Sequence, residues 1–289
     1  MPRTRLRKPD WLKVKFPVGV NYVRIDRYHR QQGLNSVCRS AACPNQGECW
    51  SKGTATFMIL GSHCSRHCRF CNISSHPPQP PDPQEARKVA TAIAELQLKH
   101  AVLTSVTRDD LPDGGAGQFV ALIEQLRLQA PDCRIELLIP DLQGDWQALE
   151  KIVAAGPEII GHNIETVPRL YPAVRPEAEY RRSLALLAQI SRLAPDIVIK
   201  SGLMLGMGET EAEIQRVMSD LREHHCQVLT LGQYLAPTAD HYPVQRYVPP
   251  DEFEQLARKG KEMGFEHVEA GPLVRSSYHA EEQFSAREG

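Results

Sequence analysis

The chain has 289 residues, of which 34 are Lys or Arg and 35 are Asp or Glu, so its formal net charge is −1. A charge this close to zero argues against a nucleic-acid binder that works through its total charge, and the apolar runs fall short of the roughly 18 residues that a transmembrane helix needs. No apolar core of a signal peptide follows the basic N-terminus. We therefore expect a cytoplasmic protein with no nucleic-acid and no membrane partner.

Apolar runs of strand length alternate with stretches of helical period along most of the chain. Strands are expected at residues 55–60, 101–106, 134–140, 158–164, 197–205 and 227–235, with a short seventh at 266–270. Helices are expected at residues 84–99, 118–129, 145–154, 177–193, 210–223 and 251–263. The last two helices begin with capping-box patterns, Thr210 with Glu213 and Asp251 with Glu254.

This alternation implies βαβ units with right-handed crossovers and a parallel sheet. Six such repeats can wind into an open doubly wound sheet or curl into a partial barrel. We expect an α/β fold, a partial (β/α)6 TIM-type barrel with N- and C-terminal extensions and an active site at the C-terminal ends of the strands. The expected parts are an N-terminal extension over residues 1–54, the barrel over 55–265 and a C-terminal extension over 266–289.

The eight cysteines are distributed unevenly. Six of them lie between residues 38 and 71, where an even distribution would place about one. A disulfide framework is typical of short secreted chains, whereas this chain is long and is expected to lack a signal peptide. Metal or cluster ligation is the better interpretation of these six cysteines.

Cys64, Cys68 and Cys71 form a C-x3-C-x2-C motif directly after the first expected strand. Three thiolates on one loop can hold three irons of a cubane and leave the fourth iron open to an exogenous amine and carboxylate. A structural zinc would need a fourth ligand, which His63 or His67 could supply, but zinc loops favour paired C-x2-C arrangements. The motif closely resembles the signature of the radical S-adenosylmethionine enzymes.

Cys38, Cys43 and Cys49 form an upstream C-x4-C-x5-C set, again with three thiolates and no fourth cysteine nearby. Cys133 and Cys226 lie in or beside strand runs, where a buried cysteine usually acts as a small hydrophobe. A cluster on this upstream triad must therefore take its fourth ligand from elsewhere in the chain.

The two cysteine sets, in this order, resemble those of the lipoyl synthase family within the radical S-adenosylmethionine superfamily. Near the C-terminus, Val-Arg-Ser-Ser-Tyr-His-Ala at 274–280 is similar to that family's Arg-Ser-Ser-Tyr motif. Stretches at 104–115, 161–166, 200–209 and 231–235 have the same family character, so the resemblance runs from about residue 9 to residue 281.

The resemblance implies two 4Fe–4S clusters, each held by one of the triads. Cys64, Cys68 and Cys71 would bind the radical-generating cluster, whose open iron chelates S-adenosylmethionine. Cys38, Cys43 and Cys49 would bind an auxiliary cluster. Its fourth ligand would be a serine of the C-terminal motif, Ser277 in preference to Ser276 by resemblance, since spacing alone does not decide between them. An alkoxide is harder and more basic than a thiolate, so a serine should be the most easily replaced ligand of that cluster.

The activity implied is that of a sulfurtransferase in lipoate biosynthesis. The family inserts two sulfur atoms, drawn from the auxiliary cluster, at carbons 6 and 8 of an octanoyl group carried on a protein lysine. The implied partners are octanoylated lipoyl carrier domains, namely dehydrogenase E2 subunits and the glycine cleavage H protein, together with an electron donor.

Polar residues at the ends of expected strands are candidate ligands to S-adenosylmethionine. Asn163 and Glu165 follow the fourth strand and could bind the ribose or the amino group, whereas Lys200 in the fifth could reach a carboxylate. The alternative for each is an ordinary polar residue at a helix start or in a barrel layer.

Two further candidates rest on resemblance. Gly114 and Gly115 resemble the family's glycine pair near the methionine amino group, although a Gly-Gly alone indicates only a turn. Phe70, beside the last cysteine of its motif, could pack on adenine or shield the cluster.

Two other functions remain open at this stage. One is sulfur insertion into a free small molecule, as in biotin synthase. The other is a binding module with two structural zinc sites, which would be colourless where iron–sulfur clusters are brown.

Overall fold

The computed structural model describes residues 6–13, 19–41, 43–51 and 54–285. Its eight strands form one sheet in chain order, with β1 antiparallel to β2 and all later neighbours parallel. The strands are β1 (Asn35–Ser36), β2 (Thr56–Ile59), β3 (His100–Ser105), β4 (Arg134–Leu138), β5 (Ile159–Gly161), β6 (Val198–Leu205), β7 (Val228–Gln233) and β8 (His267–Gly271).

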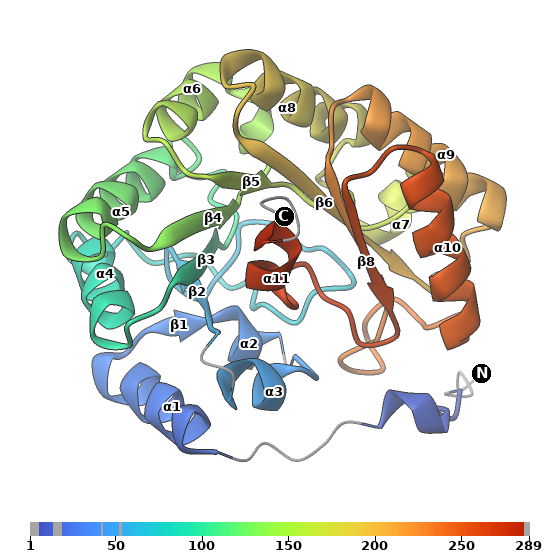
Figure 1. Cartoon of the computed structure of the whole chain (residues 1–289), viewed down its shortest axis with the longest axis horizontal. Helices are drawn as coiled ribbons and strands as arrows, with labels where there is room; N and C mark the ends of the chain where they lie inside the picture. Colours follow the sequence, from blue (N-terminus) through green and yellow to red (C-terminus); the bar gives the residue numbers. More distant parts are fainter. Residues whose placement is uncertain (1–5, 14–18, 42, 52–53, 286–289) are drawn as a thin grey trace.

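The sheet curves, and a row of helices covers its outer face (Figure 1). These outer helices are α4 (Glu85–Glu95), α5 (Ala116–Gln129), α6 (Trp146–Ala154), α8 (Tyr180–Leu193), α9 (Glu211–Glu223) and α10 (Pro250–Glu262). Among the described residues no pairing joins β8 back to β1 or β2, so the barrel is open. The predicted α/β fold, a partial TIM-type barrel, is confirmed.

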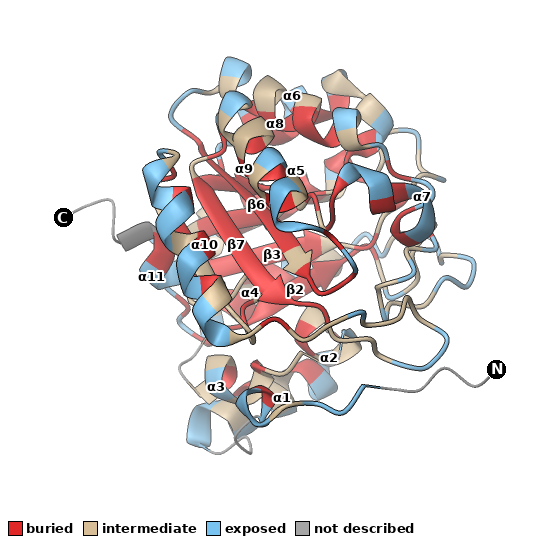
Figure 2. Ribbon diagram, turned by 90° about the vertical axis from the view of Figure 1, so that its right-hand side faces the viewer, coloured by how far each residue is buried: buried red, intermediate tan, exposed pale blue. Residues whose placement is uncertain are grey.

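The remaining helices are short or belong to the two extensions. They are η1 (Asp10–Leu12), α1 (Val20–Gln32), α2 (Val37–Ser40), α3 (Gln46–Ser51), η2 (Leu142–Gly144), η3 (Pro168–Leu170), α7 (Tyr171–Val174) and α11 (Ala280–Ser285). Helix α11 lies across one end of the curved sheet (Figures 1 and 2). In the described part of the chain no helix has both the length and the apolar character needed to cross a membrane.

The core follows from the pattern of apolar residues. Every residue of β2 and β7 is buried, as expected for parallel strands covered on both faces. Figure 2 shows this burial continuing onto the inner sides of the outer helices. In α9 the apolar residues at helical spacing are all buried, namely Ile214, Val217, Met218 and Leu221.

The capping predictions differ in outcome. The Thr210 side chain accepts a hydrogen bond from the Glu213 N–H and Glu213 reaches back to Thr210, so this capping box is confirmed. The box predicted at Asp251 is wrong, because α10 begins at Pro250 and its N-cap is Pro249. Proline suits the first helical turn, where its missing N–H would have no intrahelical partner.

Strand β5 is shorter than the predicted 158–164. The Ser201 hydroxyl donates to the His162 carbonyl oxygen (2.8 Å) and accepts from the Ile164 N–H (3.3 Å). A side chain thus binds these two backbone groups, which in a regular strand pair would bind the backbone of the neighbouring strand. Glu165 then adopts a left-handed conformation with φ of 67°. Regular strand geometry therefore ends at Gly161, and beyond it an isolated bridge between Glu165 and Leu203 keeps the chain against β6. Residues 162–165 form a wall there rather than a strand.

The N-terminal extension packs on the edge of the sheet through α1 and α3. The Trp50 side chain is fully buried, and its ring lies 5.4 Å from that of Tyr22 and 5.3 Å from that of His29. His29 also stacks on Phe57 of β2 at 5.1 Å. These contacts attach the segment with the upstream cysteines to the first parallel strand.

Candidate functional site

A cavity of about 1000 Å³ opens at the C-terminal ends of the parallel strands. Its walls include residues at the ends of β3, β4, β6 and β7, such as Ser105, Leu138, Met204 and Tyr234. Five of the six clustered cysteines line it, namely Cys38, Cys43, Cys64, Cys68 and Cys71. This is the end of a parallel barrel at which active sites lie, as predicted.

The loop with the downstream cysteines is held by backbone contacts. Cys64 N–H donates to the Ser74 carbonyl (2.8 Å), Cys71 N–H donates to the Cys68 carbonyl (3.1 Å), and a ring nitrogen of His241 lies 3.0 Å from the Cys71 carbonyl oxygen. Burial raises the pKa of Cys68 to about 11 and the pKa of Cys71 to about 12. Positive charge close to such thiols, such as that of bound iron, would favour their thiolate forms.

The chemistry of the donor set fits an iron–sulfur cluster. All eight cysteines belong to the described residues and are reduced thiols. No three His, Cys, Asp or Glu side chains within that part of the chain come close enough together to hold one metal ion. A cubane has a different requirement, since each of its irons takes its own thiolate. Three thiols on a loop that opens into a cavity meet that requirement.

The upstream cysteines lie on α2, α3 and the turn between them. Cys38 is buried near the start of α2, where the Ser36 hydroxyl accepts from its N–H. Cys43 N–H donates to the Cys38 carbonyl (3.0 Å), and burial together with the nearby Cys38 raises the pKa of Cys43. Cys49 follows on α3 and is not among the residues that line the cavity.

The C-terminal motif reaches the same cavity as the upstream cysteines. Arg275, Ser276 and Ser277 all line it. Beyond them, the Tyr278 hydroxyl donates to Glu48 at 3.2 Å, and a ring nitrogen of His279 lies 3.3 Å from the same carboxylate. The N-terminal and C-terminal extensions therefore meet beside the cavity.

Charged and polar groups form the wall beyond β5. Burial raises the pKa of Glu165, and the charges of Arg175 and Arg275 act against that rise. The Asn163 amide donates to Glu165 (3.1 Å), and one Arg175 nitrogen donates to the carbonyl oxygens of Asn163 (3.0 Å) and Ile164 (2.9 Å). Within the described residues, Asn163 Oδ1 and Arg175 Nε are buried without a hydrogen-bond partner. An acceptor and a donor are thus unpaired on two residues that line the cavity.

Three predicted cofactor-binding residues lie elsewhere. Lys200 is buried, and its ammonium donates to Glu136 at 2.7 Å. Gly114 and Gly115 precede α5, both with positive φ, and a Cβ on Gly115 would lie 2.3 Å from a Leu60 side-chain carbon. None of the three lines the cavity, whereas Phe70 does.

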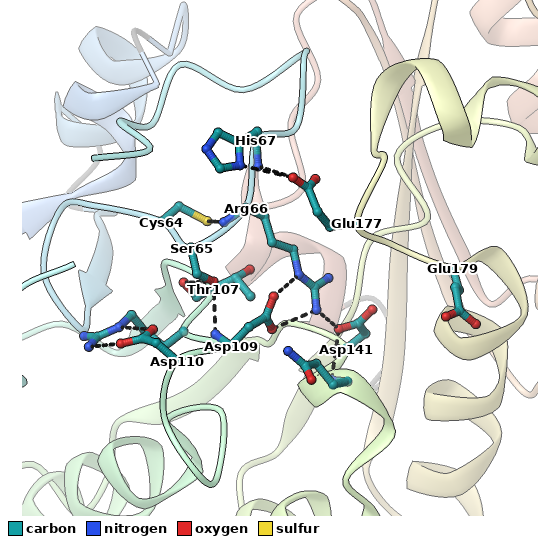
Figure 3. Close-up of polar contacts among 12 residues, drawn as sticks. Cys64, Ser65, Arg66, His67, Thr107, Asp109, Asp110, Asp141, Glu177 and Glu179 are labelled. Atoms are coloured by element: carbon teal, nitrogen blue, oxygen red, sulfur yellow. Dashed lines mark hydrogen bonds and ion pairs between the residues drawn. The ribbon is translucent and has the colours of Figure 1, made fainter. Parts of the chain in front are cut away.

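An ion-pair cluster beneath the cysteine loop was not predicted. Arg66, inside the downstream motif, pairs with Asp109 and Asp141 (Figure 3). Burial alone would raise the pKa of Asp141, but its hydrogen bond and charge pairing with Arg66 prevail and hold the pKa at about 2. Both aspartates come shortly after predicted strands, and that position was the available signal. Arg175 was also missed, because no spacing in the sequence marks it, and Arg275 was noted only as part of the Arg-Ser-Ser-Tyr motif, without a role of its own.

Comparison with known proteins defines the class. Residues 58–221 match the family described as the radical SAM superfamily. Solved structures share the fold at low identity. The structure of methylornithine synthase (PylB) has a TM-score of 0.57 at 11% identity, covering 85% of this chain and 74% of that one. Coproporphyrinogen III oxidase (HemN) from Escherichia coli has a TM-score of 0.52 at 14% identity, with 72% and 52% covered. The chain is a member of the radical SAM superfamily, which implies a 4Fe–4S cluster and S-adenosylmethionine.

More similar relatives define the family. Residues 2–43 match the N-terminal domain of lipoyl synthase. The lipoyl synthase of Roseiflexus sp. (strain RS-1) is 51% identical over 288 residues, which cover 100% of this chain and 96% of the relative. The lipoyl synthase of Chlorobium limicola is 52% identical over 288 residues, with 99% and 98% covered. The chain belongs to the lipoyl synthase family, and the predicted resemblance is confirmed.

Proposed function

We propose that the chain inserts two sulfur atoms at carbons 6 and 8 of an octanoyl group carried on a lysine of a lipoyl carrier protein. The observation that carries this proposal is one cavity that is lined by the whole downstream triad, by Cys38 and Cys43 of the upstream triad, and by residues 275–277 of the Arg-Ser-Ser-Tyr motif. A sulfur source must lie within reach of the carbon from which hydrogen is removed. One cavity shared by two cluster sites supports that arrangement.

Cys64, Cys68 and Cys71 are the proposed ligands of the radical-generating cluster. When bound, this cluster and S-adenosylmethionine supply the 5′-deoxyadenosyl radical that removes one hydrogen atom from each carbon, with one S-adenosylmethionine for each. The chain orients the cofactor and excludes water. Asn163 and Glu165 are proposed to bind its polar groups, for which the unpartnered Asn163 oxygen is one support.

Phe70 is proposed to pack on the adenine of S-adenosylmethionine, as its place in the cavity wall allows. Lys200 is better explained by the alternative of a barrel-layer residue, because it pairs with the buried Glu136. For Gly114 and Gly115 the close approach to Leu60 supports a role in the turn before α5. A role of this pair near the methionine amino group remains a prediction.

Cys38, Cys43, Cys49 and Ser277 are the proposed ligands of the auxiliary cluster, which is the proposed sulfur source. Asn45, which lies between two of these cysteines, and Glu48 both bind the C-terminal segment, and this supports a serine ligand from that segment. The proposed serine ligand, as an alkoxide, is more basic than a thiolate and is therefore easier to release from the cluster by protonation. We also propose that the chain has three parts: an N-terminal extension to residue 54, the barrel from 55 to 265, and a C-terminal extension from 266. The last part supplies β8, which completes the sheet.

The proposed partners are octanoylated dehydrogenase E2 subunits, the octanoylated glycine cleavage H protein and an electron donor, in the cytoplasm. The test is mass analysis of an octanoylated carrier peptide after reaction with the reconstituted chain, S-adenosylmethionine and a reductant. We expect a gain of two sulfur atoms, with one hydrogen atom removed from each of carbons 6 and 8 and, under these reducing conditions, one hydrogen carried on each new sulfur as a thiol. Absence of any sulfur gain, activity on free dethiobiotin alone, or a colourless zinc protein would overturn the proposal.

Ser276 and Ser277 offer a matched pair, because both line the cavity and differ by one position. S277A should reduce the iron bound to the auxiliary triad, whereas S276A should keep about eight irons per chain. The reverse result would assign the ligand to Ser276.

A further inference from the structure

The loop that holds Cys64 and Cys68 contains one buried cation, Arg66. Its side chain is only 4% exposed. Figure 3 shows it extending from the cysteine loop toward Asp109 and Asp141, with the Cys64 sulfur beside the Arg66 backbone nitrogen. A buried guanidinium requires charge partners, and the geometry of these partners constrains the loop.

Arg66 binds both carboxylates through charge-assisted hydrogen bonds. Its Nε lies 2.6 Å from Asp109 Oδ2 and its Nη2 lies 2.9 Å from Asp109 Oδ1, which is a bidentate pair. The same Nη2 lies 2.5 Å from Oδ1 of Asp141, whose side chain is fully buried. Such planar, two-pronged contacts fix orientation as well as distance.

One side chain thereby joins three consecutive strand-to-helix loops. Arg66 follows β2, Asp109 follows β3, and Asp141 follows β4. The neighbouring Ser65 adds to this junction, because its N–H donates to the Thr107 carbonyl (2.9 Å) and its hydroxyl accepts from the Asp109 N–H (3.0 Å). The cysteine loop, which follows β2, is therefore bound to the loops that follow β3 and β4.

The same residue presents a hydrogen-bond donor to a cysteine. The Arg66 backbone nitrogen lies 3.4 Å from the Cys64 sulfur. Hydrogen bonds to cluster sulfurs are one of the factors that set the reduction potential of a cluster. A donor on the sulfur stabilises the more negative, reduced form, so its loss shifts the potential to more negative values.

We propose that Arg66 is a positioning residue for the radical-generating cluster. Through Asp109 and Asp141 it holds the turn between Cys64 and Cys68 in place and keeps its own N–H directed at the Cys64 sulfur. This inference rests on the proposed function, because it assumes that the loop binds a cluster. Lysine cannot replace arginine here, since an ammonium is a point charge without the planar fork.

The test compares full-length R66K with wild type and with R169K as a matched control. Arg169 makes a bidentate pair with Glu213 (2.7 and 3.0 Å) and a third contact to the Gly208 carbonyl (2.8 Å), but its side chain is 55% exposed and does not line the cavity. Each chain is reconstituted anaerobically with iron and sulfide. The readouts are iron per chain, the rate of iron release to a chelator, and the midpoint potential of the electron paramagnetic resonance signal that responds to S-adenosylmethionine.

We expect R66K to release iron from one of two sites about tenfold faster or more, and the S-adenosylmethionine-responsive signal to shift to a more negative potential. R169K should match wild type in all three measurements. Thermal unfolding of the metal-free chains separates this effect from general destabilisation. Wild-type iron release and potential in R66K would overturn the inference.

The outcomes also separate this inference from the function on which it rests. Wild type without any cluster on the loop would refute both, whereas a wild-type cluster that is indifferent to R66K would refute only the role of Arg66. If metal-free R66K does not fold, D109N carries the same prediction with a smaller shift. That variant keeps the Arg66–Asp141 pair and loses the bidentate one, and an unchanged potential in it would count against the inference.

Discussion

The side-chain amide of Asn45 donates a 2.6 Å hydrogen bond to the backbone carbonyl of Leu273, across 228 positions of the sequence. Asn45 is buried between Cys43 and Cys49, and Leu273 comes shortly before Ser277. The segment with the upstream cysteines and the segment with the proposed serine ligand therefore depend on one another for their positions.

Replacing Asn45 by aspartate should separate these segments. The carboxylate of N45D cannot donate and would face the Leu273 carbonyl, so we expect a loss of about 1–3 kcal/mol in the free energy of unfolding. We also expect less iron on the auxiliary triad. Denaturant unfolding of the metal-free chain and iron analysis measure the two effects.

Asn21 provides the control, since its amide also donates to a carbonyl, that of Ser51 at 3.1 Å, but at an exposed site. N21D should change the free energy of unfolding by less than about 0.5 kcal/mol. Equal effects of N45D and N21D would contradict the importance of the buried bond.

Lys200 tests whether a predicted cofactor ligand is instead part of the core. Lys200 and His100 both contact the buried Glu136, at 2.7 and 2.9 Å. Burial alone would raise the pKa of Glu136, but these partners prevail and lower it to about 2. K200M leaves a buried carboxylate with one partner fewer, so we expect destabilisation of about 3–5 kcal/mol in the metal-free chain.

The matched control is K88M, because the Lys88–Asp82 pair has the same 2.7 Å separation but is exposed. Its free energy of unfolding should change far less than that of K200M, because solvent screens an exposed pair. A stable K200M chain with weakened S-adenosylmethionine binding would instead support the cofactor role.

The stability of the metal-free chain should depend on pH through His162. Burial, with the charge of Arg175 as the second cause, lowers the pKa of His162 to about 4, although Asp141 acts in the opposite direction. Its ring nitrogens contact the Ile139 carbonyl and the Ser183 hydroxyl, both at 2.9 Å. The folded chain therefore keeps this imidazole neutral.

The unfolded chain takes up the His162 proton first, near pH 6.5. The contribution of His162 to the free energy of unfolding is fully present above that pH and is lost as the pH falls toward about 4. The loss is at most about 3 kcal/mol. H162Q should flatten the stability curve in this window, as measured by urea unfolding at several pH values. An unchanged slope in H162Q would assign the loss to other groups.

Glu165 is expected to matter for the cofactor. Its carboxylate lies in the fields of Arg175 and Arg275, and E165Q would leave these guanidiniums without that negative charge. S-adenosylmethionine carries a sulfonium and an ammonium, so we expect E165Q to weaken its binding about tenfold by calorimetry of the reconstituted chain. E211Q is the control, because the exposed Glu211 accepts from Gln215 on α9 and does not line the cavity. Equal affinity in E165Q and E211Q would refute the role.

The barrel was predictable because its information is local. Apolar spacing in α9 and the mostly apolar runs of β2 and β7 depend on which residues face the core, and the sequence pattern reports that directly. The early end of β5 was not predictable, because it depends on a hydroxyl from Ser201, 40 residues beyond Gly161 in the chain and beside it only in the sheet.

The sequence by itself determined the α/β class, the six cysteines in two triads and the family. These depend on residue type and spacing, which the chain carries along its length. Only the tertiary structure decided which residues share the cavity. It brought Ser277 to the wall that Cys38 and Cys43 line, placed Lys200 on Glu136 instead, and joined Arg66 to Asp109 and Asp141. Contacts between loops of different βα units depend on how the sheet curves, and no spacing within one segment records that curvature.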